Sequence, residues 1–259
     1  MILHTFVILA YKESRFLEDC IKSIIAQEYD GKVIIATTTE NSFIKKLAKK
    51  YSIPLVIGKH TSIGGDFDFA LSCANTPLIT IAHQDDIYEK NYAAKMVEAY
   101  CANDNASIIF SDYFEIRNKK KIFNNTNLTV KRALLVPLRL FKKARWARRF
   151  SLKFGNSICC PAVTFVKTNC PTKVFESNFV CNVDWHAWEK LSKMNHSFIF
   201  VPEQLMGHRI STESTTTDTI KQGIRTKEDY AIFRRFWPEC VAKFLTRLYK
   251  NSEKSNELN

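Results

Sequence analysis

The chain has 259 residues and a mass of 29.9 kDa, a size that suits one large domain or two small ones with a substantial buried core. Its 38 Lys and Arg residues outnumber 26 Asp and Glu residues, and apolar residues make up an ordinary 46%. These values exclude a disulfide-rich peptide and a disordered tail, and they indicate a globular protein with a basic surplus.

The N-terminal residues and the cysteines indicate where such a protein works. No basic leader precedes a long apolar core, and no run of about 18 apolar residues occurs, so we expect a cytoplasmic protein without a spanning helix. The eight cysteines form no CxxC pair and no zinc-type spacing. We therefore expect reduced, buried thiols rather than disulfides or a metal cluster.

The basic surplus is confined to one window. Residues 116–175 contain fifteen Lys or Arg and no acid, which leaves 38 − 15 = 23 basic residues against 26 acids elsewhere. Within it, residues 134–150 interleave leucines and aromatics with cations, as in a basic amphipathic segment that lies on anionic lipid. Pro137 is expected to break this helix or to start it. The alternative is a solvated basic face whose aromatics pack into the core.

In the first half of the chain, short apolar runs alternate with apolar stripes at helical spacing. The runs predict strands at 3–9, 33–36, 55–57, 78–82 and 107–110. The stripes predict helices at 16–25, 43–51, 66–74 and 92–101. Ser14 is placed to cap the first helix. Runs this apolar indicate an α/β fold whose parallel sheet is covered on both faces.

Ligands of open parallel sheets bind outside the carboxyl ends of the strands. The loops at 10–13, 37–41 and 83–86 are therefore expected to carry the chemistry. Beyond residue 112 the pattern weakens. It predicts a strand at 162–166, a helix at 185–194, a strand at 198–201, a mobile Ser/Thr-rich loop at 211–218 and a helical pair at 228–248.

Two adjacent acids, Asp85 and Asp86, directly follow the predicted strand at 78–82. Carboxylates at a strand end can hold a hard divalent cation against a diphosphate, although adjacent loop acids are often only solvated or capping groups. The chain contains no GxGxxG and no GxxxxGK[ST] sequence, which argues against a dinucleotide-binding dehydrogenase and a P-loop enzyme.

Taken in order, several segments resemble the motifs of family 2 glycosyltransferases, which have the GT-A fold. The matching segments are the opening strand at 7–13, the helix end at 23–27, the Asp-x-Asp segment at 79–88, the strand at 110–113, the base segment at 182–185 and the C-terminal loop at 208–211. Together they cover roughly residues 3 to 215.

The resemblance implies a GT-A-like, Rossmann-type open sheet, mostly parallel, with helices on both faces and a C-terminal helical extension. It implies a nucleotide-sugar-binding half at 1–112 and an acceptor-binding half at 113–215, which includes the basic amphipathic segment 117–153. A C-terminal helical tail follows at 216–259. The implied reaction is inverting transfer of a sugar from a nucleotide diphosphate donor, a UDP-sugar in many relatives, to an acceptor hydroxyl.

The resemblance also assigns roles to individual residues. Asp86 and Asp85, with His83, would hold Mn²⁺ or Mg²⁺ against the donor phosphates. Asp184 would be the catalytic base that takes the acceptor proton, its alternative role being the N-cap of the helix that follows. The residues expected to bind the donor are Ala10, Tyr11, Glu13, Thr38, Asp85, His208 and Arg209.

The chain departs from the family pattern at four places. Thr37–Thr39 stand where the family commonly has Asp, so recognition of the base is not fixed by the pattern. His83 replaces the first acid of Asp-x-Asp, and imidazole is a softer ligand than Mg²⁺ prefers. His208 stands where Tyr is usual, and Ser211 where His is usual.

The motifs and the basic window together favour an enzyme of cell-surface or lipid-linked polysaccharide synthesis. Its partners would be a nucleotide-sugar donor, a glycan or polyprenyl-linked acceptor and an anionic membrane surface, and it would lie peripherally on the inner membrane face. Nucleic acid is not an expected partner. Two alternatives stay open: a basic nucleic-acid-binding protein, and a GT-A scaffold that has lost turnover.

Overall fold

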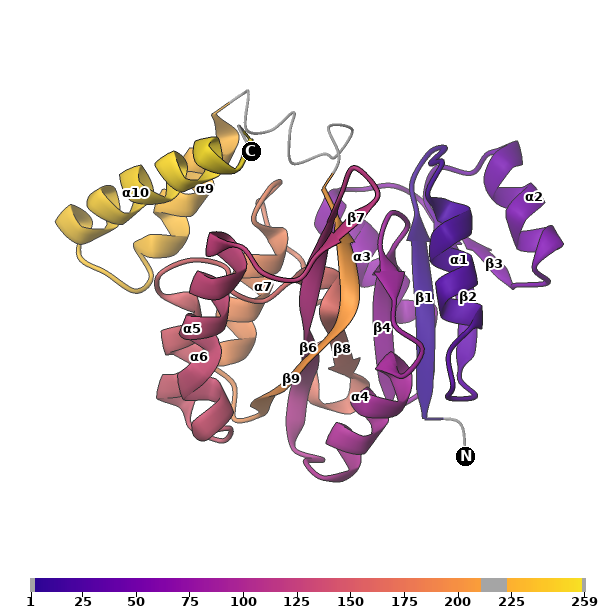
Figure 1. Cartoon of the computed structure of the whole chain (residues 1–259), viewed down its shortest axis with the longest axis horizontal. Coiled ribbons are helices and arrows are strands. Elements are labelled where there is room, and N and C mark those ends of the chain that lie inside the picture. The colour runs from indigo at the N-terminus through magenta and orange to yellow at the C-terminus, as the bar shows by residue number, and fades with distance from the viewer. Residues whose placement is uncertain (1–2, 211–222, 258–259) are drawn as a thin grey trace.

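A computed structural model describes residues 3–210 and 223–257 of the chain, with side chains up to residue 250. In its first half, strands and helices alternate as the sequence predicts (Figure 1). The strands are β1 (His4–Ala10), β2 (Lys32–Thr37), β3 (Leu55–Ile57), β4 (Leu78–His83) and β5 (Ile87–Tyr88). The helices are α1 (Leu17–Ile25), α2 (Ser42–Lys50), α3 (Ile63–Ser72) and α4 (Tyr92–Cys101).

The second half adds longer strands and a group of helices. The strands are β6 (Ala106–Arg117), β7 (Lys120–Ile122), β8 (Val163–Val166) and β9 (Ser197–Arg209). The helices are α5 (Thr126–Leu140), α6 (Arg145–Leu152), α7 (Val183–Ser192), α9 (Ile224–Phe233) and α10 (Glu239–Glu257). The predicted C-terminal helical pair is thus confirmed, whereas the predicted loop at 211–218 lies outside the described residues.

In the described part of the chain the strands form one nine-stranded sheet, in the order β3-β2-β1-β4-β8-β6-β9-β5, with β7 beside β6. Strands β3, β2, β1 and β4 are parallel, and β9 is parallel to β6. Only β8 enters the middle of the sheet antiparallel to both neighbours. The predicted α/β fold with a mostly parallel sheet is confirmed. The carboxyl ends of β1, β2 and β4 therefore share one edge.

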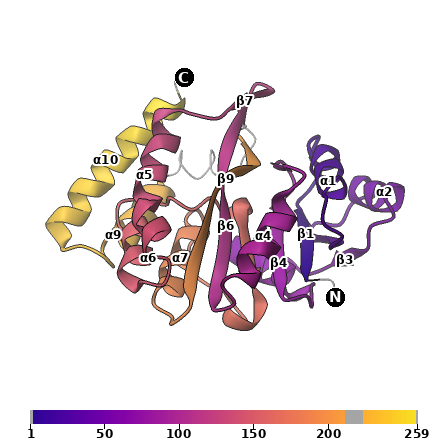
Figure 2. The same ribbon diagram turned by 60° about the horizontal axis from the view of Figure 1, so that its bottom comes forward.

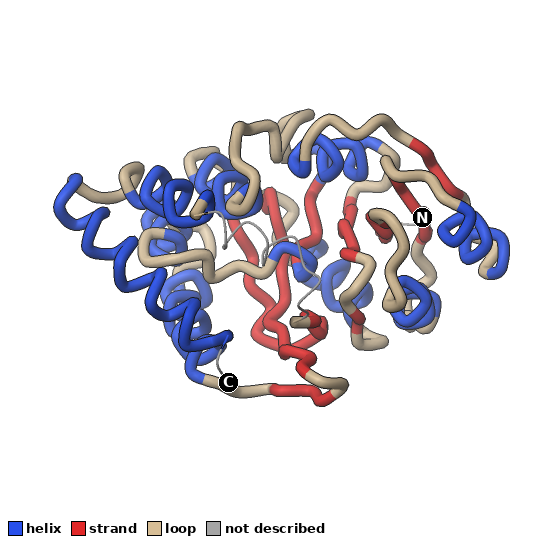
Figure 3. The backbone as a smooth tube through the Cα atoms, turned by 90° about the horizontal axis from the view of Figure 1, so that it is seen from above, coloured by secondary structure: helices blue, strands red, loops and turns tan. Residues whose placement is uncertain are grey.

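Helices cover both faces of the sheet (Figure 3). One buried cluster joins the sheet to α1, α2 and α4, and the apolar stripe of α1 lies wholly inside it. The other cluster joins the opposite face to α3 and α7, and it continues outward through α5, α6, α9 and α10. Figure 2 shows α5, α6, α9 and α10 grouped beside β6 and β9, on the side away from β1.

Two local predictions are wrong. The N-cap of α1 is Phe16, and Ser14 precedes it, so the Ser14 hydroxyl accepts the Phe16 N–H at 3.3 Å instead of capping a helical N–H. Pro137 neither breaks nor starts a helix but lies inside α5, three residues before its end. The carbonyl that Pro137 leaves without an N–H partner belongs to Ala133. Since Ala133 is exposed, water can satisfy that carbonyl.

All eight cysteines are free thiols. The prediction that they are buried is wrong for Cys101 and Cys240, which are exposed on the surface. Among the described residues, no helix combines the length and the apolar character that crossing a membrane requires.

Candidate active site

Three loops from the first half of the chain meet at the carboxyl edge of the sheet, as predicted. The Gln84 side chain joins two of them, since its Oε1 accepts the Tyr11 N–H at 3.0 Å and its Nε2 donates to the Tyr11 carbonyl at 2.8 Å. The Lys12 N–H donates to Thr39 Oγ1 at 2.6 Å, which ties in the loop after β2. Lys12 adopts a left-handed backbone conformation (φ 54°), so the contacts hold a strained turn in place.

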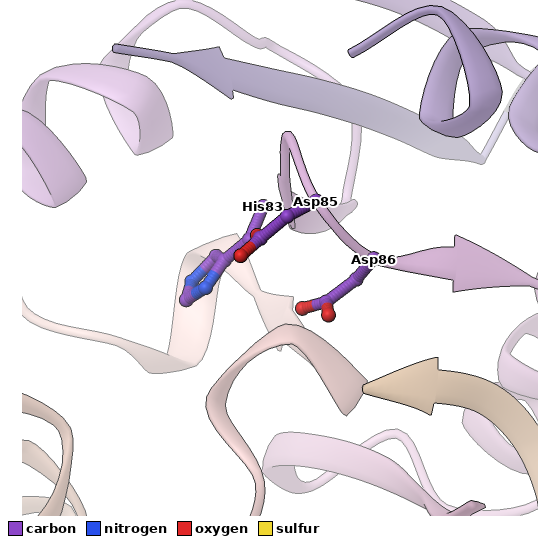
Figure 4. A group of neighbouring side chains, drawn as sticks. All are labelled: His83, Asp85 and Asp86. Carbon is purple, nitrogen blue, oxygen red and sulfur yellow. The ribbon is translucent and has the colours of Figure 1, made fainter. Parts of the chain in front are cut away.

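His83, Asp85 and Asp86 form a compact group, which we call the donor-side group. One potential ligand atom from each lies within 4.8 Å of the other two, and the three side chains leave the same loop after β4 (Figure 4). Asp86 is fully buried, and its Oδ2 has no hydrogen-bond partner among the described residues. A buried carboxylate oxygen without a donor is costly unless a cation neutralises it, so this group fits a divalent metal ion.

His83 brings a nitrogen ligand to the donor-side group. Its ring stacks on Phe67 with centroids 5.3 Å apart, and its buried Nε2 lacks a partner within the described chain. Burial lowers the pKa of His83, against the opposing effect of the neighbouring carboxylates, so the imidazole is neutral at pH 7. A neutral imidazole can ligate a metal ion, and a mixed nitrogen and oxygen set suits Mn²⁺ better than Mg²⁺.

The end of β9 closes over the donor-side group. Asp86 Oδ1 accepts the Arg209 N–H at 2.8 Å and lies 3.1 Å from His208 Nδ1. Burial lowers the pKa of His208, but the Asp86 carboxylate outweighs it and leaves that pKa raised. Burial, and then the charge of Asp86, raises the pKa of Asp85. Two carboxylates this close repel each other when both are ionised, and a bound cation would relieve that repulsion.

Arg209 is held by several contacts rather than solvated. Its Nε donates to the Asp85 carbonyl at 2.8 Å, and its guanidinium lies 4.2 Å from the centroid of the Phe16 ring. His208 and Arg209 therefore contact the donor-side group, and their binding of the donor stays a prediction. Ser211 lies outside the described residues.

The residues expected at the nucleoside lie along the same edge. Tyr11 and Glu13 are exposed, whereas the Ala10 side chain is buried in the core, so only its backbone faces this edge. Thr38 Oγ1 donates to Asp66 Oδ2 at 3.0 Å.

Asp66, which the sequence did not single out, lies beside Thr38. It is 7% exposed, its Oδ2 lies 2.8 Å from His60 Nδ1, and its Oδ1 has no hydrogen-bond partner in the described residues. The available signal was an acid directly after Gly64 and Gly65 in a helical first turn. Asp66 thus brings a carboxylate to Thr38, within the stretch Thr37–Thr39 that has no acid of its own.

Asp184 lies in the first turn of α7, but Asn182 is the N-cap, so the capping alternative is wrong. Asp184 Oδ2 accepts the Asn156 Nδ2–H at 2.7 Å, and Oδ1 accepts the Trp185 N–H at 2.7 Å. Burial is the largest influence and raises the pKa of Asp184, while these hydrogen bonds and the cations of Arg225 and Lys131 partly oppose it. The carboxylate is a stronger base than an exposed Asp.

Asp184 and Asp86 both influence the thiols at residues 159–160. Burial raises the pKa of the Cys159 and Cys160 thiols, and the charges of the two carboxylates raise the pKa of each thiol further. The two acids, almost a hundred residues apart in the chain, therefore act electrostatically on the same pair of residues.

Comparisons with known proteins place the chain in a family. Residues 5–168 match the glycosyl transferase family 2 pattern, which is more than half of the chain. The protein therefore belongs to glycosyl transferase family 2. No match was found among curated proteins.

Solved structures share its fold at low sequence identity. A mannosyltransferase, PcManGT of Pyrobaculum calidifontis, in complex with GDP-Man and Mn²⁺, superposes with a TM-score of 0.63 at 13% identity, over 95% of this chain and 70% of that one. Residues 1–349 of TarS from S. aureus superpose with a TM-score of 0.60 at 9% identity, over 95% and 69% of the two chains. The same TarS fragment in complex with UDP-GlcNAc gives a TM-score of 0.59 at 9% identity, over 95% and 70%. These likenesses confirm the GT-A-like fold.

Proposed function

We propose that the protein is an inverting, metal-dependent glycosyltransferase that moves a sugar from a nucleotide diphosphate donor to an acceptor hydroxyl. The observation that carries this proposal is the group of His83, Asp85 and Asp86 at the carboxyl edge of the sheet, in which the buried Asp86 Oδ2 has no hydrogen-bond partner among the described residues. Family membership and the relatives that bind UDP-GlcNAc or GDP-Man support the donor class. We favour a UDP-sugar.

In this mechanism Asp184 takes the proton of the acceptor hydroxyl as its oxygen attacks the anomeric carbon. Burial keeps the carboxylate basic, and the hydrogen bond from Asn156 fixes its orientation. Asp85, Asp86 and His83 would hold Mn²⁺ or Mg²⁺, which neutralises charge on the departing nucleoside diphosphate when bound. Tyr11, Glu13, Thr38, His208 and Arg209 would bind and orient the donor.

We also propose that the acceptor, a glycan or a polyprenyl-linked glycan, is met at an anionic membrane surface on the cytoplasmic side. The supporting observation is an exposed apolar and basic face at the end of α5 and the start of α6. Leu140 is 68% and Trp146 54% exposed, and Lys142, Lys143 and Arg145 are exposed beside them. Exposed aromatics among cations fit an anionic lipid surface.

The decisive experiment compares Asp184→Asn with the unmodified protein across a panel of UDP- and GDP-sugars with Mn²⁺. Removing the base should lower transfer about 10²–10⁴-fold while leaving donor binding intact. Asp104→Asn, an exposed acid in the loop before β6, is the matched control and should keep full activity. Full activity in Asp184→Asn would overturn the role of Asp184. Absence of transfer by the unmodified protein with every donor would instead favour a scaffold without turnover.

A further inference from the structure

One cation of the basic window is half-buried without an acid beside it. Lys131 lies on α5, and its Nζ donates to the Tyr113 hydroxyl at 2.9 Å. Within the described residues the ammonium group makes no other hydrogen bond. Neighbouring cations are neutralised: Arg132 Nε lies 2.6 Å from Asp112 Oδ2, and Arg149 pairs with Glu189 at 3.1 Å. In the described part of the chain no carboxylate forms an ion pair with Lys131.

Withdrawing an ammonium group from water costs free energy, and a hydrogen bond to a neutral hydroxyl does not fully offset that cost. A protein that gains nothing from such a charge is more stable with an apolar side chain in its place. We therefore expect a negatively charged ligand to supply the counter-charge of Lys131.

The position of Lys131 shows which ligand it would meet. The Tyr113 ring that Lys131 contacts packs edge-on against His208, with centroids 6.2 Å apart, and His208 lies 3.1 Å from Asp86. The Lys131 charge also opposes the burial that raises the pKa of Asp184. Tyr113 and His208 thus link Lys131 to the donor-side group, where the proposed function puts the phosphates of the donor.

We propose that Lys131 binds a phosphate group of a substrate beside the donor-side group. The inference deepens the proposed function and rests on it. The phosphate has two possible sources: the donor diphosphate, whose charge grows as the bond to the sugar breaks, or a phosphate on the acceptor. A cation held in place by Tyr113 suits either, since phosphate oxygens take charge-assisted hydrogen bonds from ammonium groups.

The test uses Lys131→Met, which keeps the length of the side chain and removes its charge, and Lys131→Arg, which keeps the charge. Lys46→Met, at an exposed lysine of α2, is the matched control. Calorimetric titrations measure UDP and GDP, each with Mn²⁺, and then inorganic phosphate added to the nucleotide-saturated protein.

If the donor is the source, Lys131→Met weakens nucleoside diphosphate binding tenfold or more and leaves binding of uridine and guanosine unchanged. If the acceptor is the source, nucleotide binding is unchanged and phosphate binding to the saturated protein is lost. Lys131→Arg retains binding in both cases. Unchanged binding of nucleotide and phosphate by Lys131→Met would overturn the proposal, as would the absence of both in the unmodified protein.

The melting temperature separates a ligand-binding role from a structural one. Because Lys131 lacks a counter-charge, the ligand-free Lys131→Met variant should melt at the same temperature as the unmodified protein or higher. A clear fall would show that the lysine serves the fold and would contradict the proposal. These readouts do not need transfer, so failure of Asp184 as the base and failure of Lys131 as the phosphate ligand are separate results.

Discussion

His83 is the residue at which this chain departs most clearly from its family, because an imidazole stands where the pattern has a carboxylate. Its buried Nε2 lies without a partner in the described residues, near Asp85 and Asp86. We predict that His83→Asp raises affinity for Mg²⁺ relative to Mn²⁺, since a third carboxylate gives the oxygen-rich set that Mg²⁺ prefers. Competition titrations of the two ions would measure the ratio.

Electron paramagnetic resonance provides an independent check on His83. Bound Mn²⁺ should show hyperfine coupling to a ligand nitrogen in the unmodified protein and lose it in His83→Asp. His196→Gln is the control, because His196 is half-buried and its Nδ1 lies 2.9 Å from Asn105 Oδ1, just before β6 and β9 begin, at the edge of the sheet opposite the donor-side group. A nitrogen coupling that persists in His83→Asp would contradict ligation by His83.

The sequence could reveal some site residues and not others. Asp85 and Asp86 follow an apolar strand, and Asp184 stands near the start of an amphipathic helix, so local pattern and family resemblance were enough to find them. Lys131 had no such signal, and Asp66 had only the two glycines that precede it. Their importance comes from contacts with Thr38 and Tyr113, which only the fold brings beside them.

At the scale of elements, α9 holds the segment that carries Asp184. The Glu228 carboxylate accepts the backbone N–H groups of Val180, Cys181 and Asn182 at 2.6, 2.9 and 2.9 Å. The next residue, Asp229, accepts the Asn182 side-chain N–H at 2.7 Å, with both groups buried. Glu228 is thus a positioning residue for the start of α7.

We predict that Glu228→Gln lowers kcat about 10- to 100-fold and leaves the KM of the donor unchanged, because its amide would repel backbone N–H groups and displace Asp184. In an Asp184→Asn background the same change should add no further loss. Lys227→Gln, an exposed change on the same helix, is the control. Equal losses in both backgrounds would mean that Glu228 serves stability alone.

The second prediction at this scale concerns lipid binding by the exposed face at the end of α5 and the start of α6. The contacts of its arginines decide which cations can be replaced without disturbing the fold. Arg148 is buried and donates to the Met194 carbonyl at 2.9 Å, and Arg149 pairs with Glu189, so neutralising either would disturb the fold. Replacing Lys142, Lys143 and Arg145 with Gln should instead remove about 1 kcal/mol of lipid attraction for each charge. Co-sedimentation with anionic vesicles would measure the loss.

The control for the vesicle experiment neutralises three exposed cations of α2 instead, namely Lys45, Lys46 and Lys49. This variant has the same net charge as the α5–α6 variant, so general attraction to anionic lipid falls equally in both. Equal partitioning of the two variants would remove α5–α6 as the contact surface.

Element boundaries were less predictable where tertiary contacts override the local pattern. The sequence predicts a strand at 107–110, whereas β6 runs to Arg117 through the polar residues Asp112 and Glu115. Both acids are buried because Arg132 and Arg117 neutralise them at 2.6 and 2.9 Å. A prediction rule that places every acid in solvent therefore makes this strand too short.

For the whole molecule, the alternation of strands and helices predicted the class of fold but not the sheet order. Strand β8 pairs with β4 and β6 although it lies about 80 residues after the former in sequence, and no local pattern encodes such pairing. This antiparallel insertion puts β6 and β9 beside the parallel half of the sheet. It thereby brings His208 and Arg209 to Asp86.

Because that contact joins the two halves of the sheet, a ligand at the donor-side group should stabilise the molecule as a whole. At 100 times its dissociation constant, a nucleoside diphosphate with Mn²⁺ would add about 2.7 kcal/mol to the free energy of unfolding. For a protein of this size this raises the melting temperature by about 5–10 °C. Asp85→Asn should abolish the shift while leaving the ligand-free melting temperature unchanged, since no described side chain depends on that carboxylate. Asp86→Asn should instead lower both, because Asp86 Oδ1 also holds Arg209. A shift of full size without Mn²⁺, or in Asp85→Asn, would show that the nucleotide binds without the acids of the donor-side group.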